Sequence, residues 1–195
     1  YIEGKGFDKL TNAYAYGKAA LTVQTFEENF EIAVENYVTV NFEAMMKLVD
    51  LIGGVEIELT EKEAAHMAEM YDMWGQKSGL QTLDGWHALC YCRIRRIDSD
   101  YKRNDRQFRV LMEIYRKVKD LPASRYTELL SAMYEDVYTD MTLADAISLA
   151  GTILDITKTA EIEHVKLVDS EHSAPGRLNS SSVVLVDSLS DTAKR

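Results

Sequence analysis

Residues 37–60 read YVTVNFEAMMKLVDLIGGVEIELT, and this stretch contains three segments with different hydrophobic periods. Apolar and polar residues alternate over 37–42, which predicts a β-strand. Over 42–52 the apolar residues recur at helical spacing, and the glycine pair 53–54 is typical of a helix end. Strict alternation returns over 55–60, as in a half-exposed strand. With a helix expected before it, this rhythm of helix and strand predicts a mixed sheet with helices packed on it.

The rest of the chain is predicted to contain more helices than strands. Helices are expected at 8–16, 18–30, 61–72, 86–94, 103–121 and 123–136. Another helix should follow the capping-box pattern of Thr142 and Asp145. Gly17 separates the first two helices, and Pro122 ends the helix predicted at 103–121. Strands are expected at 162–168 and 183–186, and loops at 73–85 and 169–182.

Length and composition limit the class of protein. A chain of 195 residues favours one domain that buries a proper core. Its 46% hydrophobic and 28% charged residues are ordinary for a soluble globular protein. The net charge of −10 argues against a general nucleic-acid binder, which normally has a basic domain. The sequence contains no run of 18 apolar residues, so it predicts no membrane span.

Metal-binding patterns are not evident among the cysteines and histidines. Cys90 and Cys92 are the only cysteines, and a CxC pair without suitably spaced partners is a poor zinc signal. The two thiols are expected to be small core residues. The four histidines form no HExxH or similar pattern.

Positive charge is concentrated in residues 93–109, RIRRIDSDYKRNDRQFR, which hold six of the ten arginines. Seven basic residues against three acidic ones give this stretch a charge of +4. The other residues therefore carry −14, because −10 minus +4 is −14. A guanidinium binds phosphate or carboxylate through two parallel hydrogen bonds and stays charged at physiological pH. This stretch is therefore expected to bind an anion.

The spacing of the basic residues suggests how they would act together. Arg103, Arg106 and Gln107 should lie on one face of a helix. Three more arginines end the preceding helix: Arg93, Arg95 and Arg96. Two basic clusters that meet across a short acidic turn at 98–100 could clamp a diphosphate. A solvated charged face with internal Arg–Asp pairs is the alternative, and charge pattern alone weighs the two equally.

Three separated motifs resemble those of the LytR-CpsA-Psr family, in the same order and at similar spacing. KLTNAYAYG at 9–17 is similar to the family's KxNxAyxyG, and residues 37–57 are similar to YvxvdFxxfxxlvDxlGGVxv. Residues 79–111 contain ALCYCRIR, an acidic turn, DYKR and RQ, which resemble ALxYxRxR, DxxR and RQ. The resemblance covers residues 8–118. The remaining residues, 119–195, have only a general similarity to the C-terminal part of the family.

This resemblance implies an extracytoplasmic bacterial enzyme at the membrane surface. It would transfer an anionic glycopolymer, such as a teichoic acid or capsular polysaccharide, from a polyprenyl-diphosphate carrier to peptidoglycan. The implied fold is an α/β (α+β) sandwich with a mixed central sheet and helices on both sides. It would form a single catalytic domain over residues 1–195, with a long apolar pocket for the lipid tail.

The site residues are carried over from the matched motifs. The catalytic positions of RxR, DxxR and RQ correspond to Arg93, Arg95, Asp100, Arg103, Arg106 and Gln107. Arg96 is added as a substrate-binding candidate, with Lys9 and Asn12 from the first motif. The guanidinium groups are expected to face one cleft beside a narrow apolar cavity. Arg106 is expected to be exposed, so that its removal would change stability by at most about 1 kcal/mol.

Some parts of the family pattern are expected before the start of this chain. They include the first strands, magnesium-binding aspartates and a membrane anchor. The resemblance therefore predicts Mg²⁺ as a cofactor with ligands that are not in this chain. The alternative function is a non-catalytic protein of cell-envelope assembly that binds polyprenyl phosphate or an anionic glycan. A transcriptional attenuator, as some relatives have been described, is disfavoured by the acidic charge and the missing helix-turn-helix pattern.

Overall fold

The computed structural model describes residues 1–72, 77–157, 173–178 and 181–186. Within these ranges, five side chains are not described: Asp100, Ala123, Thr157, Ser181 and Ser182. The chain divides into two compact units. The first comprises Tyr1–Tyr37 with Thr157–Arg195, and the second comprises Val38–Ile156.

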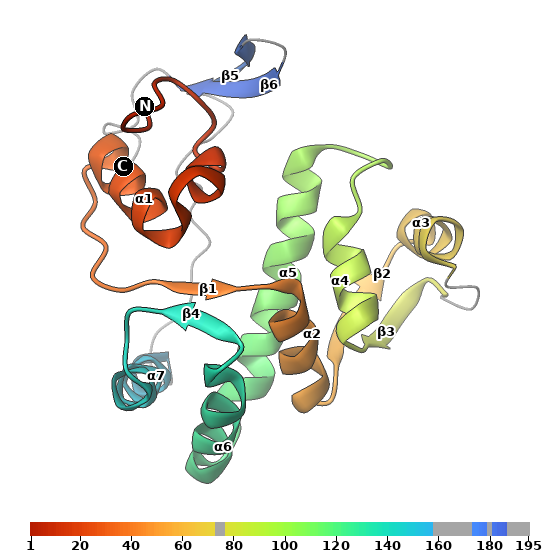
Figure 1. Ribbon diagram of the computed structural model, residues 1–195. Helices are drawn as coiled ribbons and strands as arrows, with labels where there is room; N and C mark the ends of the chain where they lie inside the picture. The colour runs from red at the N-terminus through yellow and green to blue at the C-terminus, as the bar shows by residue number, and fades with distance from the viewer. Residues whose placement is uncertain (73–76, 158–172, 179–180, 187–195) are drawn as a thin grey trace. The chain divides into compact units, whose positions relative to one another are not determined.

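The first unit contains one long, kinked helix. α1 (Asn12–Phe30) has non-helical backbone angles at Gly17 and Lys18, and Lys18 has a φ of 57° (Figure 1). A left-handed φ is costly for a residue with a Cβ, so this position interrupts the helix. The break predicted at Gly17 is confirmed as a kink, whereas the helix begins at Asn12 rather than at residue 8.

A hairpin completes the described part of the first unit. β5 (Ser173–Leu178) pairs antiparallel with β6 (Ser181–Val186). The strand predicted at 183–186 is confirmed and begins two residues earlier. The loop predicted over 169–182 is wrong in part, because it contains β5. The strand predicted at 162–168 lies outside the described residues.

The second unit alternates strands and helices along the chain (Figure 1). Its elements are β1 (Val38–Val40), α2 (Phe42–Leu51), β2 (Val55–Leu59), α3 (Glu61–Tyr71), β3 (Gly79–Leu83), α4 (Gly85–Arg93), α5 (Asp100–Lys119), α6 (Ala123–Tyr134), β4 (Val137–Thr139) and α7 (Leu143–Thr157). The predicted helices all appear, with small shifts at their ends. No helix in the described part of the chain has the length and apolar character needed to cross a membrane.

The strands of the described residues form three separate antiparallel pairs rather than one mixed sheet. In the second unit, β1 pairs with β4 and β2 pairs with β3. Along β2, the residues Val55, Ile57 and Leu59 are buried while the glutamates between them are exposed, as the alternation predicts. The loop predicted over 73–85 is wrong in part, because it contains β3.

The helices begin where side chains bind free backbone amides. The Asn41 side chain accepts a hydrogen bond from the Ala44 amide at 2.7 Å, at the start of α2. Thr60 and Glu63 form a capping box that opens α3. At α2's other end, Asp50 Oδ1 accepts from the Gly85 amide at 2.7 Å, which ties α2 to the start of α4. These caps satisfy donors that a helix cannot bond internally.

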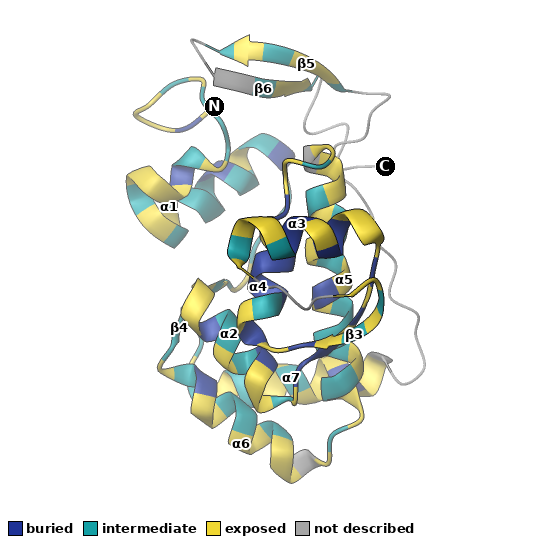
Figure 2. Ribbon diagram, turned by 90° about the vertical axis from the view of Figure 1, so that its right-hand side faces the viewer, coloured by how far each residue is buried: buried dark blue, intermediate teal, exposed yellow. Residues whose placement is uncertain are grey.

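Helix α4 lies in the centre of the core of the second unit. It contacts α2, α3, α5 and β3, and its residues 88–92 are all buried (Figure 2). Tyr91 is fully buried, and the Arg109 guanidinium donates to its hydroxyl oxygen at 3.2 Å. Gly85 permits this arrangement, since a Cβ there would lie 2.3 Å from the Met46 carbonyl oxygen. The end of α4 and the loop after it thus hold their arginines on a rigid base.

Candidate active site

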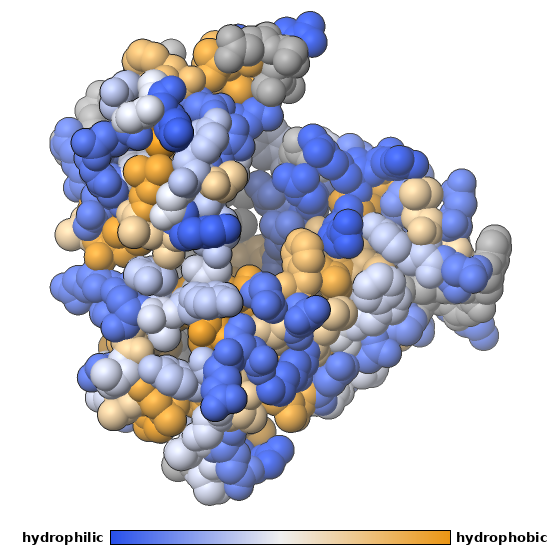
Figure 3. Space-filling model, in the orientation of Figure 1, coloured by the Kyte–Doolittle hydropathy of each residue, from blue (hydrophilic) through white to orange (hydrophobic). Residues whose placement is uncertain are grey.

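A cavity in the second unit lies among three segments of the chain. It has a volume of about 610 Å³. The end of β1 and the start of α2 contribute residues 40–42 and Met45, α4 contributes Leu89 and Cys92, and one face of α5 forms the third wall. Figure 3 shows apolar and hydrophilic side chains next to each other on the surface of this unit. The cavity belongs wholly to the second unit.

Three arginines of the basic stretch 93–109 line this cavity. Four of the predicted site residues line it: Arg93, Arg95, Arg103 and Gln107. Arg93 is in the last turn of α4, and its guanidinium lies over the Phe42 ring at 5.6 Å from the centroid. A cation–π contact of this kind restricts the side chain without removing its charge. Three of the four arginines expected to face one cleft, Arg93, Arg95 and Arg103, thus line the same cavity.

The wall formed by α5 changes from polar to apolar along the helix. Arg103 and Gln107 are followed on the same face by Val110, Leu111 and Ile114. At 1.5 Å per residue, the stripe from 103 to 114 extends about 16 Å along the helix axis. Leu111 is 59% exposed even though it lines the cavity. The cavity therefore offers a cationic end and an apolar end, which suits an amphiphile with an anionic head group.

Arg106 is not part of this cavity, which corrects the prediction that it is exposed and binds the diphosphate. It is 3% exposed and faces the core. Its Nε donates to Glu63 Oε1 at 2.7 Å, and its Nη1 donates to the Ile94 carbonyl oxygen and to Asp98 Oδ1, each at 3.1 Å. Nη2 also donates to the second carboxylate oxygen of Asp98. Its hydrogen-bonding capacity is directed to the protein itself.

The Arg106 ion pairs shift the pKa values of both partners. Burial alone would raise the pKa of the Glu63 carboxyl, but hydrogen bonds from Arg106 and Thr60 outweigh burial and hold this pKa below its ordinary value. Burial alone would lower the pKa of Arg106, and its hydrogen bonds to Asp98 and Glu63 raise it instead. Both groups are therefore charged at neutral pH. Arg106 thus forms the internal Arg–Asp pair of the alternative, but it does so in the core and not on a solvated face.

The remaining predicted site residues lie elsewhere. Arg96 Nη1 contacts the Met70 sulfur at 3.7 Å and does not line the cavity. Asp100 is the first residue of α5, and its side chain lies outside the described part. Lys9 and Asn12 belong to the first unit, where Asn12 donates to Asp8 Oδ1 at 3.0 Å. Their predicted contact with a diphosphate stays a prediction.

Several residues of the cavity were missed by the sequence reasoning. Asn41 and Phe42 line it from the start of α2, and they belong to the second family motif, in which neither was given a role. The apolar residues of α5 could have been found, because they continue the Arg103–Gln107 face at three- and four-residue steps. Cys92 also lines the cavity, and burial raises the pKa of its thiol to about 12. It is 9% exposed, as expected for a core residue.

The polar lining of the cavity does not fit Mg²⁺. Its polar side chains are arginines and amides, whereas Mg²⁺ binds carboxylates and other oxygen ligands. No group of three or more His, Cys, Asp or Glu side chains that could hold a metal occurs within the described residues. The magnesium cofactor remains a prediction that concerns residues other than these.

Comparison with known proteins identifies the family. The family model described as LytR_cpsA_psr matches residues 1–190. The chain belongs to the LytR-CpsA-Psr family. The resemblance seen in three sequence motifs is thereby confirmed, and the match extends through the C-terminal part.

Individual members of the LytR-CpsA-Psr family are moderately similar to the chain. Polyisoprenyl-teichoic acid–peptidoglycan teichoic acid transferase TagT of Bacillus subtilis is 34% identical over 179 residues, which is 90% of this chain and 54% of TagT. The TagU transferase of Enterococcus faecalis is 35% identical over 153 residues, which is 76% of this chain and 48% of that protein. The chain thus spans about half the length of these curated relatives.

A solved structure supports the fold assignment. The structure of TagT bound to LIIa-WTA has a TM-score of 0.82 and 29% sequence identity, and the match covers 99% of this chain and 72% of that one. Together with the helices and small sheets described above, this similarity confirms the α+β class.

Proposed function

We propose that this protein transfers an anionic glycopolymer from a polyprenyl-diphosphate carrier to peptidoglycan on the outer side of the bacterial membrane. The observation that carries the proposal is the two-ended cavity, where Arg93, Arg95, Arg103 and Gln107 adjoin an apolar wall. A diphosphate head would lie among the cations, and the first part of a polyprenyl tail along α5. The similarity to TagT and TagU, named as teichoic acid transferases, supports this substrate class.

The transfer would replace one bond to phosphorus with another. A hydroxyl of the acceptor attacks the phosphorus atom that carries the polymer, and the bridging phosphoanhydride bond breaks. The polyprenyl phosphate leaves with the bonding electron pair, a phosphodiester forms between polymer and acceptor, and the hydroxyl proton is released. Negative charge increases on the bridging and leaving oxygens. Fixed guanidinium groups stabilise such charge more in the transition state than in the ground state.

A second candidate function follows from the absence of carboxylates in the described lining of the cavity. A pocket whose described lining has cations but no carboxylate can bind polyprenyl diphosphate without transferring its polymer. The protein would then be a binding or regulatory component of envelope assembly. The two functions share the ligand and differ in turnover.

The test replaces Arg103 with alanine and with lysine. Arg103→Ala should reduce polymer transfer by about a hundredfold, as the loss of one preorganised charge donor does. Arg103→Lys should recover little, since an ammonium cannot supply two parallel hydrogen bonds. Transfer is measured as release of polymer from a labelled polyprenyl-diphosphate carrier, with thermal unfolding followed in parallel.

Arg116→Ala is the matched control on the same helix. Arg116 is half-exposed, pairs with Glu56 and Glu113, and lies off the cavity. Its removal should leave transfer near the wild-type rate. Transfer by Arg103→Ala at the wild-type rate would contradict the proposal. Tight carrier binding by the wild type without any polymer release would favour the binding protein.

A further inference from the structure

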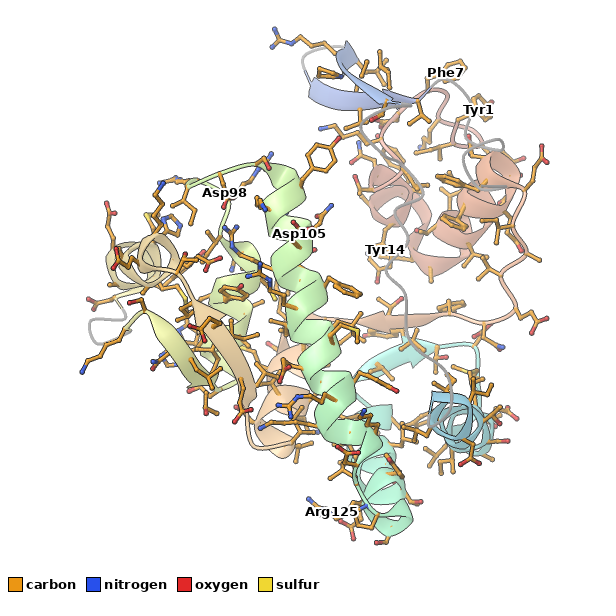
Figure 4. All side chains as sticks on the ribbon, turned by 180° about the vertical axis from the view of Figure 1, so that it is seen from behind. Tyr1, Phe7, Tyr14, Asp98, Asp105 and Arg125 are labelled. Atoms are coloured by element: carbon orange, nitrogen blue, oxygen red, sulfur yellow. The ribbon has the colours of Figure 1, made fainter. Side chains whose placement is uncertain are left out.

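The guanidinium of Arg106 binds two residues that lie between the cavity arginines in the chain, Ile94 and Asp98. The Ile94 carbonyl, which accepts from Nη1 at 3.1 Å, lies between Arg93 and Arg95 in the chain. Asp98 lies in the loop between Arg95 and Arg103, and both its carboxylate oxygens accept from Arg106. Figure 4 shows Asp98 in this loop between α4 and α5. One side chain thus links the two segments that carry the basic groups.

Glu63 fixes Arg106 from the opposite side. It is 4% exposed, and its Oε1 accepts from Arg106 Nε at 2.7 Å. Its Oε2 accepts from both the amide and the hydroxyl of Thr60, each at 2.9 Å. The hydrogen bonds from Thr60 therefore fix the carboxylate at the start of α3, independently of its bond to Arg106. Neither Glu63 nor Arg106 lines the cavity.

We infer that Glu63 is a positioning residue for the diphosphate site, an inference that rests on the proposed function. Through Arg106 it fixes the segment 94–98, and thereby the spacing of Arg93 and Arg95 from Arg103. Ile94 is fully buried, so packing anchors its side chain while Arg106 orients its carbonyl. Cations held at a fixed spacing bind a diphosphate without the entropic cost of ordering them. None of the hydrogen-bond partners of Arg106 lines the apolar end of the cavity.

The experiment separates head-group binding from tail binding. Glu63→Gln removes the charge but keeps an oxygen acceptor, and Asp98→Asn does the same at the other end of Arg106. Binding of farnesyl diphosphate and of farnesol is measured by calorimetry, at a temperature where each variant is folded. Glu113→Gln is the control, because it also removes a carboxylate partner of an arginine on α5.

The expected result is a loss of affinity for farnesyl diphosphate alone. Its Kd should rise about tenfold in Glu63→Gln, which corresponds to about 1.4 kcal/mol. Farnesol should bind Glu63→Gln and the wild type equally. Glu113→Gln should match the wild type for both ligands. Should Glu63→Gln fail to fold, the less buried Asp98→Asn provides the same comparison.

Two results would overturn the inference. One is an unchanged Kd for farnesyl diphosphate in the folded variants, and the other is an equal loss for both ligands, which would mean a general collapse of the cavity. In both cases the wild type binds farnesyl diphosphate, so the proposed function survives. A wild type that does not bind it would refute the proposed function, and the inference with it.

Discussion

Replacing Arg106 with alanine should destabilise the protein strongly, because it leaves a carboxylate in the core without its cation. Glu63 is 4% exposed and would keep only its hydrogen bonds to Thr60. Breaking a buried ion pair by removing one partner costs about 3–5 kcal/mol. Asp98 adds little to this cost, since its side chain is 27% exposed and can be rehydrated. Small domains have about 5–15 kcal/mol of stability in total.

The loss should depend on pH in a direction that identifies Glu63. In the wild type the pKa of Glu63 lies below its unfolded value, so its contribution to stability is present above that unfolded pKa. This contribution is lost as the pH falls through the lower, folded pKa. Without Arg106, burial should raise the pKa of Glu63 above the unfolded value of about 4.3. The variant then loses stability as the pH rises, and the gap to the wild type widens toward neutral pH.

Urea unfolding followed by far-ultraviolet circular dichroism measures both effects. The two proteins are compared at neutral pH and near pH 4, the range in which carboxyl groups titrate. Arg116→Ala serves as the control, since this half-exposed arginine should contribute less than about 1 kcal/mol. An Arg106→Ala protein within about 1 kcal/mol of the wild type at neutral pH would refute the buried-pair reasoning. So would a loss that is the same at both pH values.

Two further predictions concern the core of the second unit. Burial raises the pKa of Cys90 to about 11 and of Cys92 to about 12, so iodoacetamide should label the native protein far more slowly than the urea-unfolded one at neutral pH; equal rates would contradict this. Gly85→Ala should destabilise by about 1–3 kcal/mol, because its Cβ would lie 2.3 Å from the Met46 carbonyl oxygen. The control is Gly151→Ala, in α7, where there is open space around the glycine; it should stabilise the protein by about 0.5–1 kcal/mol. Thermal melts compare the two variants. A Gly85→Ala protein more stable than Gly151→Ala would refute the packing described for α4.

The strand–helix–strand order of residues 38–59 could be predicted because each period is local. Buried Val55, Ile57 and Leu59 alternate with exposed glutamates, and Gly53 and Gly54 have the positive φ that ends α2. Strand β3 could not be found this way. GLQTL has little β-propensity of its own and becomes a strand by pairing with β2, from which α3 separates it in the sequence. Such pairing depends on tertiary context rather than on local sequence.

The sequence predicts which side of α5 carries the site residues. It does not predict which of them face the cavity and which face α3. At 100° per residue, Arg103, Arg106 and Gln107 share one broad side of α5. The cavity takes Arg103 and Gln107, while Arg106 is turned toward Glu63 of α3. Spacing could not reveal this division, because Glu63 lies 43 residues earlier in the chain. The correct partner of Arg106 becomes visible only when α3 is placed against α4 and α5.

The different surroundings of these arginines imply different responses to ionic strength. Mobile ions screen charges in water over about 8 Å at physiological salt, but they do not enter the dry space around Arg106 and Glu63. Arg93 and Arg95 are exposed at the cavity, where solvent that contains those ions surrounds them. Added salt should therefore weaken the capture of a diphosphate while leaving the Arg106–Glu63 pair intact. If the proposed diphosphate site is right, salt should release the bound anion without unfolding the protein.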